Sequence, residues 1–347
     1  MHKKIGILGG GQLGRMLSVA ASRLGLQTHI FEPQANCPAG DVSHFVTTAE
    51  YSNTRALEQF AKSVDVVTYE FENIPTEALD IIEEFVPIRP DRQALKISQD
   101  RLLEKVWLND LGLDTARYSV DMDKAYDIIG APSILKTRRF GYDGKGQYKI
   151  NHKQDFELAM QEVGDTPVIL EGLINFKQEI SIIGARNNND EIKCYEPGEN
   201  LHTNGILHTT TVPASLEERE RRDAILIAHK ILDRLKYVGV IGIELFVTDN
   251  GLVVNEIAPR VHNSGHWTQN GCAVDQFEQH IRAVCDWSLA DCKRKNNIIM
   301  QNLIGDDIEK VEELSKMSNV AIHIYGKTEV KPGRKMGHFN KIVDVEV

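Results

Sequence analysis

The residues with the clearest chemical potential lie in the segment 133–147, SILKTRRFGYDGKGQ. We expect a short buried strand to end at Leu135, so that Lys136 follows at the exit of that strand. Three glycines in the next residues would let the backbone approach a ligand closely. Main-chain N–H groups could then face phosphate oxygens, with Lys136 and Lys145 as point charges. An ordinary basic hairpin loop uses the same residue types, so this segment alone leaves both interpretations open.

Two glutamates, Glu244 and Glu256, could hold a metal ion. We expect strands over residues 240–248 and 252–258, and a three-residue connection with glycine in the left-handed position places Glu244 opposite Glu256. Like charges repel across a ladder, and a divalent cation would remove that repulsion. Mg²⁺ takes one or two carboxylates together with substrate phosphates, so the pair is a candidate bridge to a nucleotide. A two-residue Asn-Gly turn would instead place the glutamates on opposite faces.

A glycine fingerprint lies near the N-terminus. Gly9, Gly11 and Gly14 match G-x-G-x-x-G between a predicted strand and helix, and Glu32 follows at the distance of about 20 residues typical of a ribose-binding acid. This pattern makes an NAD-dependent dehydrogenase a candidate. The same glycines could serve only tight packing of strand against helix, so the fingerprint does not settle function.

The segment YEFEN at 69–73 places two acids and an amide at the end of a predicted strand. Parallel sheets bind ligands at that edge, which makes Glu72 a candidate ligand residue. An acid at this position could equally cap the next helix.

The elements that would position these residues alternate between strand and helix in the first third of the chain. This alternation predicts a parallel α/β sheet for residues 1 to about 98. The expected strands are 4–8, 28–32, 65–70 and 86–88, and the expected helices are 12–24 and 77–85.

Beyond residue 98 we expect a mixture of helices, strands and turns. A helix over 98–111 would carry Arg101 in its first turn, where the helix dipole disfavours a cation, so Arg101 needs another partner. His202 is expected in a loop over 200–205. The remaining predicted features are strands at 167–171, 178–183, 192–195, 320–325 and 341–347, a capping box at 215–218 that opens a helix to about 237, and turns at 187–190 and 331–334.

Composition bounds the class of protein. The 347 residues predict two or three domains. The formal charge is -10 and no Lys/Arg run suggests a nucleic-acid track, so we expect no nucleic-acid partner. Five cysteines without C-x-x-C spacing are typical of reduced thiols in a cytoplasmic protein. No apolar run approaches the roughly 18 residues of a membrane span, and we see no signal-peptide pattern, so we expect no membrane association.

Together, the lysine and glycine loop, Glu171 at a later strand end and the two hairpin glutamates resemble the ATP-grasp superfamily. Four motifs are similar to those of its N5-carboxyaminoimidazole ribonucleotide synthase family: GGGQLGRM at 9–16, KTRRFGYDGKGQ at 136–147, NEIAPRVHNSGH at 255–266 and YGKTEVKPGRKMGH at 325–338. The resemblance spans the chain in order. It implies an N-terminal parallel α/β, Rossmann-like domain (1–98), a central ATP-grasp domain (99–293) and a small β-rich C-terminal domain (294–347).

The resemblance implies a reaction of purine biosynthesis. ATP would phosphorylate bicarbonate to carboxyphosphate, and the carboxyl group would reach the amine of 5-aminoimidazole ribonucleotide, with Mg²⁺ or Mn²⁺ held by Glu244 and Glu256. By family analogy we expect a homodimer, with a mutase of the carboxylated product as a functional partner. The residues that would bind ATP are Arg101, Lys136, Gly141, Tyr142, Asp143, Gly144, Lys145, Gly146, Gln147, Glu171, Gly172, Leu173, Ile174, Glu179, His202, Asn255 and Glu256.

The same resemblance assigns the catalytic and substrate residues. Asp143 would accept the amine proton and Arg260 would face the anionic acyl phosphate. The implied catalytic residues are Asp143, Lys145, Arg260, His262 and Asn263. The implied residues for the ribonucleotide are Gly11, Gln12, Glu72, Tyr142, Asp143, Lys327 and Arg334. Its phosphate would lie against Lys327, Arg334 and the turn at Gly11 and Gln12, at a helix N-terminus. Lys145 stands where many relatives carry arginine, which puts a bidentate contact at that position in doubt.

Three other functions stay open from the residues. A dehydrogenase would leave the segment 136–147 and the Glu244/Glu256 pair without a role. Another ATP-grasp ligase would share most of the ATP site but not the motif at 325–338. A nucleotide-sensing protein with a degenerate site is disfavoured, because the lysines and carboxylates that the chemistry needs are all present.

Overall fold

The N-terminal part of the protein is a parallel four-stranded sheet with the strand order β3-β2-β1-β4. The computed structural model describes residues 3–141 and 144–343. Leu8 pairs with Phe31 on one side and Tyr69 on the other, so these strands end at one common edge. The elements are β1 (Lys4–Leu8), α1 (Gln12–Arg23), β2 (Gln27–Glu32), β3 (Phe45–Thr48), α2 (Thr54–Lys62), β4 (Val66–Tyr69) and α3 (Thr76–Glu83). The parallel sheet is confirmed, while the strand expected at 86–88 is only an isolated bridge between Val67 and Ile88.

The helix expected over 98–111 is α5 (Arg101–Asp110), which begins later than expected. A helix that was not expected, α4 (Arg92–Ser98), precedes it. The break between them falls at Asp100, whose carboxylate accepts the N–H groups of Leu102 and Leu103 and so caps α5. Arg138 binds the same carboxylate through two nitrogens at 3.0 and 2.8 Å, which fastens the start of α5 to the chain that follows Lys136.

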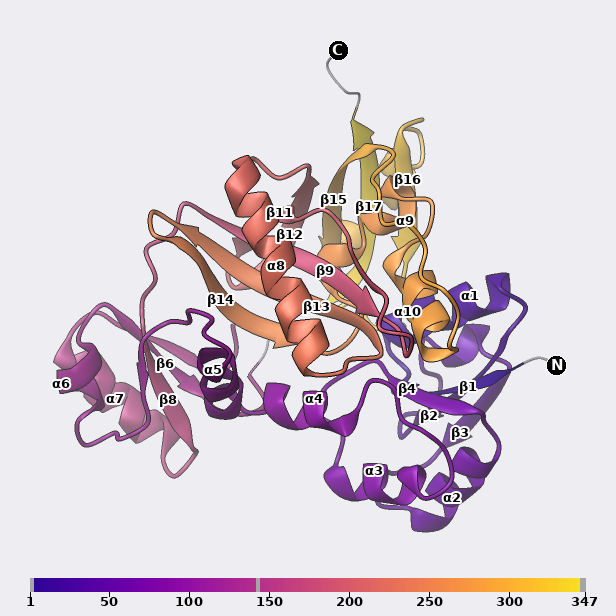
Figure 1. The fold of residues 1–347 in the computed structure, drawn as a ribbon, viewed down its shortest axis with the longest axis horizontal. Helices are drawn as coiled ribbons and strands as arrows, with labels where there is room; N and C mark the ends of the chain where they lie inside the picture. Colours follow the sequence, from indigo (N-terminus) through magenta and orange to yellow (C-terminus); the bar gives the residue numbers. More distant parts are fainter. Residues whose placement is uncertain (1–2, 142–143, 344–347) are drawn as a thin grey trace.

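A small lobe projects from the rest of the molecule, at the left of Figure 1. Its four-stranded sheet has the order β5-β8-β6-β7, and every neighbouring pair is antiparallel. Its elements are β5 (Tyr118–Ser119), α6 (Ala125–Ile129), β6 (Ser133–Thr137), β7 (Gln147–Ile150), α7 (Lys153–Val163) and β8 (Val168–Gly172). The lysine and glycine segment is therefore the hairpin that joins β6 to β7.

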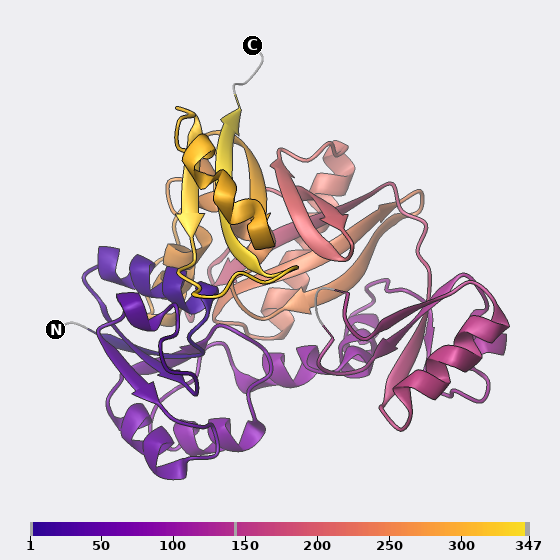
Figure 2. The same ribbon diagram turned by 180° about the vertical axis from the view of Figure 1, so that it is seen from behind.

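A nine-stranded sheet forms the main body, with the order β14-β13-β9-β11-β12-β15-β17-β16 and β10 beside β9. The strands are β9 (Gln178–Arg186), β10 (Ile192–Cys194), β11 (Gly198–Thr203), β12 (Ile206–Val212), β13 (Gly239–Thr248), β14 (Gly251–Ala258), β15 (Asn297–Ile304), β16 (Val320–Ile324) and β17 (Lys335–Val343). The helices are α8 (Glu218–Arg234), α9 (Thr268–Gly271), α10 (Gln276–Val284) and α11 (Val311–Leu314). The C-terminal strands extend the central sheet through the β12–β15 pair and do not form a sheet of their own (Figure 2).

Three local predictions were wrong. His202 lies on β11 rather than in a loop, because the turn comes two residues later, at Asn204 and Gly205, which both have positive φ. The helix expected from 215 begins at Glu218, and its capping box is formed by Glu217 and Glu220. The last strand starts at Lys335, well before 341, because it pairs along its length with β15, an element that the sequence did not indicate.

Helix α10 joins the N-terminal sheet to the main body. Its residues share one buried core with α1, and Leu17 and Ile281 are both fully buried there. His280 of α10 accepts the N–H of Val240 on β13 at 3.0 Å, and its Nε2 lies 2.7 Å from the hydroxyl of Thr68 on β4. Across the described ranges, no helix combines the length and apolar character needed to traverse a bilayer.

Candidate active site

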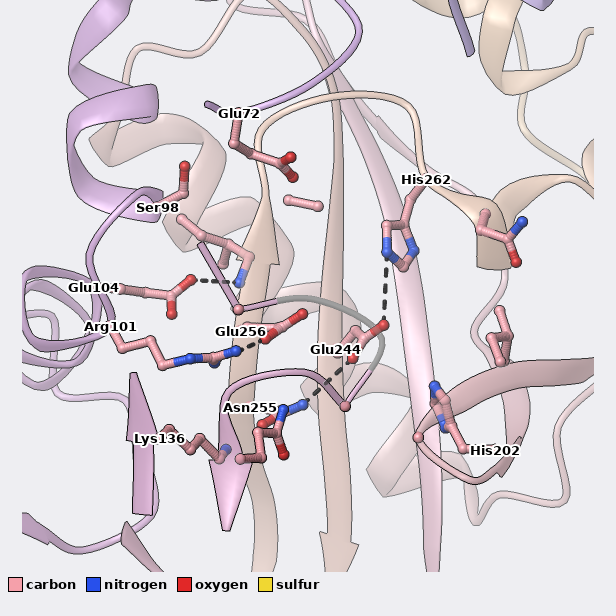
Figure 3. A pocket seen from close by; sticks show the side chains of 18 of the residues that line it. Glu72, Ser98, Arg101, Glu104, Lys136, His202, Glu244, Asn255, Glu256 and His262 are labelled. Atoms are coloured by element: carbon pink, nitrogen blue, oxygen red, sulfur yellow. Dashed lines mark hydrogen bonds and ion pairs between the residues drawn. The ribbon is translucent and has the colours of Figure 1, made fainter. Parts of the chain in front are cut away.

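A cavity of about 590 Å³ lies where the small lobe, the main sheet and the edge of the N-terminal sheet meet. Its volume is within the range of roughly 300–1,000 Å³ that small-molecule sites occupy. Figure 3 shows that side chains from all three parts converge on it: Glu72 from the N-terminal part, Lys136 from the small lobe, and Glu244 and Glu256 from the main sheet. Residues far apart in the sequence are thus brought into one site.

A cluster of buried charged residues lies where β6 and β8 of the small lobe meet α5. Lys136 on β6 donates to Glu171 Oε2 on β8 at 2.9 Å. The Lys105 ammonium, from α5, is 3.4 Å from Glu171 Oε1. Burial alone would raise the pKa of Glu171, but Lys136 and Lys105 hold it below its ordinary value. The ionised Glu171 carboxylate therefore stands between Lys136, which lines the cavity, and Lys105, which does not.

Helix α5 turns three charged residues, spaced i, i+3 and i+4, toward the site. Arg101 pairs with Glu256 Oε2 at 3.1 Å, which is the partner that its place in the first turn required. Glu104 accepts the N–H of Ile257 at 2.8 Å, and burial followed by the Glu256 carboxylate raises the pKa of Glu104 to about 8. Together with Lys105, these residues connect α5 to β14 and to β8.

Glu244 and Glu256 lie directly opposite each other, as predicted, but a different backbone feature puts them there. Thr248 pairs with Gly251, so the connection has two residues rather than three. Continued regularly, that register would place Glu244 opposite Asn255. A bulge between Glu244 and Leu245 shifts the pairing by one residue. Asn255 and Glu256 consequently both line the cavity, and Asn255 Nδ2 donates to Glu244 Oε2 at 3.3 Å.

The two glutamates differ in protonation. Burial, and then the Glu256 carboxylate, raise the pKa of Glu244 to about 7. Burial alone would raise the pKa of Glu256 as well, but Arg101 and Lys136 hold it below its ordinary value. Two adjacent carboxylates and an amide oxygen are hard donors that fit Mg²⁺ or Mn²⁺. Among residues 3–141 and 144–343, no group of three or more His, Cys, Asp or Glu could hold a metal.

Arg260 lies between the N-terminal part and the main sheet. Its guanidinium is 2.7 Å from Glu72 Oε1, and both residues line the cavity. His262 Nε2 is 3.6 Å from Glu244 Oε1, and burial lowers the pKa of His262 well below its ordinary value, so its imidazole is neutral. Asn263 is fixed by a reciprocal amide pair with Asn302, at 2.9 and 2.6 Å. The segment 260–263 therefore presents one cation, Arg260, and two neutral polar groups, His262 and Asn263.

His202 and Glu179 form an ion pair on the neighbouring strands β11 and β9. Burial is the largest influence and would lower the pKa of His202, but the Glu179 carboxylate and the charge of Glu244 together outweigh it and raise that pKa. Near them, Phe176 and Phe246 stack with their ring centroids 4.8 Å apart and line the cavity. This edge of the cavity combines a flat apolar wall with polar groups, as a nucleoside requires.

The N-terminal glycine turn is already occupied by the protein's own carboxylates. The Gly10 N–H donates to Glu32 Oε2 at 2.7 Å, the Gly14 N–H donates to Glu70 Oε2 at 2.7 Å, and the Gly11 N–H donates to Glu70 Oε1. A Cβ on Gly11 would lie 2.5 Å from Glu70, so the glycine permits this internal contact. A dinucleotide pyrophosphate would have to displace two carboxylates, which argues against the dehydrogenase. Gly11 itself does not line the cavity, whereas Gln12 does.

The glycine hairpin borders the cavity, although two of its residues lie outside the described ranges. Tyr142 and Asp143, expected to face the imidazole substrate, are those two residues. Gly146 has φ +68°, and a Cβ there would lie 2.5 Å from the Thr137 hydroxyl, so glycine is required at this position. Leu173, expected near adenine, lines the cavity, but its N–H already donates to the Pro132 carbonyl at 3.2 Å.

Most residues expected at the site line the cavity. They are Gln12, Glu72, Arg101, Lys136, Gly141, Gly144, Gln147, Glu171, Gly172, Leu173, Ile174, Glu179, His202, Glu244, Asn255, Glu256, Arg260, His262 and Asn263. The described residues that do not line it are Gly11, Lys145, Gly146, Lys327 and Arg334. Lys327 donates to the Lys335 carbonyl at 2.7 Å, and Arg334 donates to the Glu329 carbonyl at 3.0 Å, so in this conformation both side chains are engaged by backbone.

Sequence reasoning missed several charged residues of the site. Glu104, Arg138 and Lys335 line the cavity, and Lys105 lies directly behind it against Glu171. Glu104 and Lys105 could have been found from their helical spacing to Arg101, and Arg138 from its place in the motif at 136–147. Lys335 could not be distinguished from its neighbours Lys331 and Arg334 by sequence alone.

Three family models match successive parts of the chain. A ribonucleotide synthetase preATP-grasp domain matches residues 1–99, an ATP-grasp domain matches 106–277, and a phosphoribosylaminoimidazole carboxylase C-terminal domain matches 299–346. The chain is 46% identical to N5-carboxyaminoimidazole ribonucleotide synthase of Brucella melitensis over 346 residues, covering 97% of this chain and 96% of that protein.

Two solved structures are similar over nearly the whole chain. One is N5-carboxyaminoimidazole synthetase from Staphylococcus aureus complexed with ADP, with TM-score 0.93, 38% identity and coverage of 99% of this chain and 94% of that one. The other is N5-carboxyaminoimidazole synthase from Aspergillus clavatus in complex with ADP and 5-aminoimidazole ribonucleotide, with TM-score 0.92, 32% identity and the same coverage, 99% and 94%.

The fold and the site define an ATP-grasp enzyme, an ATP-dependent ligase. Within this class of enzyme, the chain belongs to the N5-carboxyaminoimidazole ribonucleotide synthase family, whose members carboxylate 5-aminoimidazole ribonucleotide with ATP in purine biosynthesis.

Proposed function

We propose that this protein converts 5-aminoimidazole ribonucleotide, bicarbonate and ATP into N5-carboxyaminoimidazole ribonucleotide, ADP and phosphate through carboxyphosphate. The observation that carries the proposal is the convergence of Lys136, the Glu244/Glu256 pair and Arg260 on one cavity of about 590 Å³. Each of these groups matches a requirement of the reaction: a cation for ATP phosphate, carboxylates for a metal, and a guanidinium for an acyl phosphate.

ATP is proposed to lie between the small lobe and the main sheet. The stacked rings of Phe176 and Phe246 suit the adenine face, and the Glu179/His202 pair suits the ribose hydroxyls. Lys136 is the cation for a phosphate, and N–H groups of the hairpin 141–147 would cover the phosphate chain.

Glu244 and Glu256 would hold Mg²⁺ or Mn²⁺ beside the ATP phosphates, with Asn255 steadying Glu244. Such a cation neutralises phosphate charge while the γ-phosphoryl group is transferred. Glu244 must lose its proton to serve as a ligand, and a neighbouring dication would favour that loss. Arg101 already balances Glu256 at 3.1 Å and would help keep that carboxylate ionised.

Arg260, His262 and Asn263 are proposed to receive bicarbonate and then carboxyphosphate. A bicarbonate oxygen forms a bond to the γ-phosphorus while the bond from that phosphorus to ADP breaks. The carboxyl carbon then bonds to the substrate amine, either directly or as released carbon dioxide, and phosphate departs with the bicarbonate oxygen. A planar guanidinium suits this anion, and the neutral His262 adds a donor without repelling Arg260.

The ribonucleotide is proposed to enter from the side of Gln12 and Glu72, with Tyr142 and Asp143 at its imidazole, Asp143 taking the amine proton, and Lys145 nearby on the hairpin. Lys327 and Arg334 are proposed for its phosphate. Both now donate to backbone carbonyls, and rotation of their side chains would be needed to reach it. Lys335, which lines the cavity, supports a basic entrance on this side.

We further propose a cytoplasmic homodimer whose product passes to a mutase of N5-carboxyaminoimidazole ribonucleotide. The free cysteines Cys37, Cys194, Cys272, Cys285 and Cys292 suit a reducing compartment. The dimer and the mutase rest on family analogy.

Isotope transfer tests the proposed chemistry. With ¹⁸O-labelled bicarbonate, Mg-ATP and the ribonucleotide, one labelled oxygen should appear in inorganic phosphate, because the bond between phosphorus and the bicarbonate oxygen survives carboxyl transfer. Mass spectrometry of the phosphate measures it. Turnover that yields unlabelled phosphate would exclude carboxyphosphate. In that case water rather than labelled bicarbonate would have attacked the γ-phosphorus of ATP.

A further inference from the structure

Lys105 is a buried cation that the proposed reaction does not use. Only 2% of its side chain is exposed, and it is not among the residues that line the cavity. A buried ammonium is stable only when paired. Its partner is Glu171 Oε1, at 3.4 Å, on strand β8 of the small lobe. Figure 1 shows α5, which carries Lys105, beside β6 and β8.

Glu171 lies between two ammonium groups that differ in their access to the cavity. Lys136, which donates to its Oε2 at 2.9 Å, also lines the cavity and can turn toward a ligand. Lys105 has no such access. Within the described residues, Glu171 Oε1 accepts no hydrogen bond, so the Lys105 ammonium is the group that balances this oxygen.

An anionic phosphate in the cavity would compete with Glu171 for Lys136. Without a second cation, the movement of Lys136 would leave a buried, unpaired carboxylate on β8, which is strongly unfavourable. Arg101 also faces Glu171, but its guanidinium is engaged by Glu256 at 3.1 Å. Lys105 is therefore the cation that can stay with Glu171 after Lys136 leaves.

We propose that Lys105 is a positioning residue: it keeps Glu171 ionised and fixed on β8 while Lys136 passes from Glu171 to a phosphate of ATP. This inference rests on the ATP site of the proposed function. In the free protein Glu171 pairs with both Lys136 and Lys105; nucleotide binding would remove the pair with Lys136 and leave the pair with Lys105.

Removing the charge of Lys105 tests this exchange. Lys105→Met should weaken ATP binding at least tenfold in titration calorimetry, while the dissociation constant of 5-aminoimidazole ribonucleotide changes less than twofold. ATP binding by the variant should also take up a proton, seen as a binding enthalpy that depends on the buffer, because Glu171 loses Lys136 with no other cation to replace it. Lys96→Met, at an exposed position on α4, is the control and should bind ATP normally.

A double-mutant cycle separates this role from a merely structural one. In a Glu171→Gln background there is no carboxylate to balance, so adding Lys105→Met should change ATP affinity less than twofold. A tenfold loss in both backgrounds, or unchanged ATP binding by Lys105→Met, would overturn the proposal. If Lys105→Met alone does not fold, the ATP affinity of Glu171→Gln is compared with that of the double variant. A difference below twofold supports the proposal, and a tenfold loss overturns it.

Failure of the proposed function has a different signature. An unaltered enzyme that binds ATP but shows no turnover with bicarbonate and the ribonucleotide would contradict the proposed reaction. The ATP-binding comparison between Lys105→Met and the unaltered enzyme would remain readable in that case.

Discussion

At the scale of single residues, the site depends on carboxylates held in different protonation states. Glu256 is kept ionised by Arg101 and Lys136, whereas Glu244, directly across the ladder, has a pKa of about 7. The dication that we propose for this pair would complete the ionisation of both carboxylates.

Glu256→Gln should reduce magnesium-dependent ATP turnover by at least a hundredfold and leave the fold intact, because glutamine keeps the shape but loses the charge that a metal needs. ADP release and circular dichroism measure the two effects. Glu313→Gln, at an exposed position on α11, serves as the control. Near-normal turnover by Glu256→Gln would remove the metal assignment.

Lys327→Ala should mainly raise the apparent binding constant for the ribonucleotide, about tenfold or more, with a smaller effect on the constant for ATP, because the proposed role of Lys327 is on the ribonucleotide phosphate. Steady-state kinetics with each substrate varied measures this. Lys316→Ala, in an exposed pair with Glu312, is the matched control. An unchanged binding constant for the ribonucleotide would contradict the proposed role of Lys327 at its phosphate.

At the scale of elements, a few contacts fix how helices and strands meet. The bulge in β14 brings Asn255 and Glu256 to the same cavity, and α5 reaches both β14 and β8 through one charged face. His280 of α10 is a comparable joint, because its ring nitrogens contact β13 and β4. The Val240 N–H occupies Nδ1, so the proton is on Nε2 and the ring is neutral.

His280 makes stability depend on pH in a calculable direction. Burial lowers its pKa to about 3, below that of an unfolded histidine, so its contribution is complete above about pH 6.5 and is lost as pH falls toward 3. Lowering the pH from 7 to 5 should reduce the free energy of unfolding by about 2 kcal/mol through His280 alone. His280→Gln should weaken the pH dependence over that interval by about the same amount, measured by urea unfolding at each pH; an unchanged slope would contradict the assignment.

At the scale of the whole molecule, the three segments that the family models match share a hydrophobic core. Strands β15–β17 continue the central sheet, and Ile298, Met300 and Tyr325 pack in the same core as Leu17 and Ile281. The active-site cavity is likewise lined by residues from Gln12 to Lys335.

Truncation after residue 293 should therefore give an aggregating chain without a cooperative unfolding transition, because it exposes the β12 edge and removes part of the shared core. Size-exclusion chromatography and thermal unfolding measure this. A soluble, cooperatively unfolding fragment would show that the C-terminal strands are an independent appendage.

Local signals in the sequence predicted much of this architecture. The parallel sheet follows from alternation of strand and helix, and the unfavourable place of Arg101 correctly indicated a partner outside its helix. The Glu244/Glu256 pairing was predicted for an incorrect reason, since a two-residue turn and a bulge replace the three-residue turn. A bulge, the role of Lys105 and the continuation of the sheet into β15 depend on partners distant in sequence, which local patterns do not contain.

The most direct test of the central claim is ADP release from the purified protein with Mg-ATP and bicarbonate, with and without 5-aminoimidazole ribonucleotide. The proposed function predicts strong stimulation by the ribonucleotide, because its amine consumes the carboxyl group that ATP has activated. ATP binding without any stimulation would contradict the proposed substrate and turn attention to another acceptor.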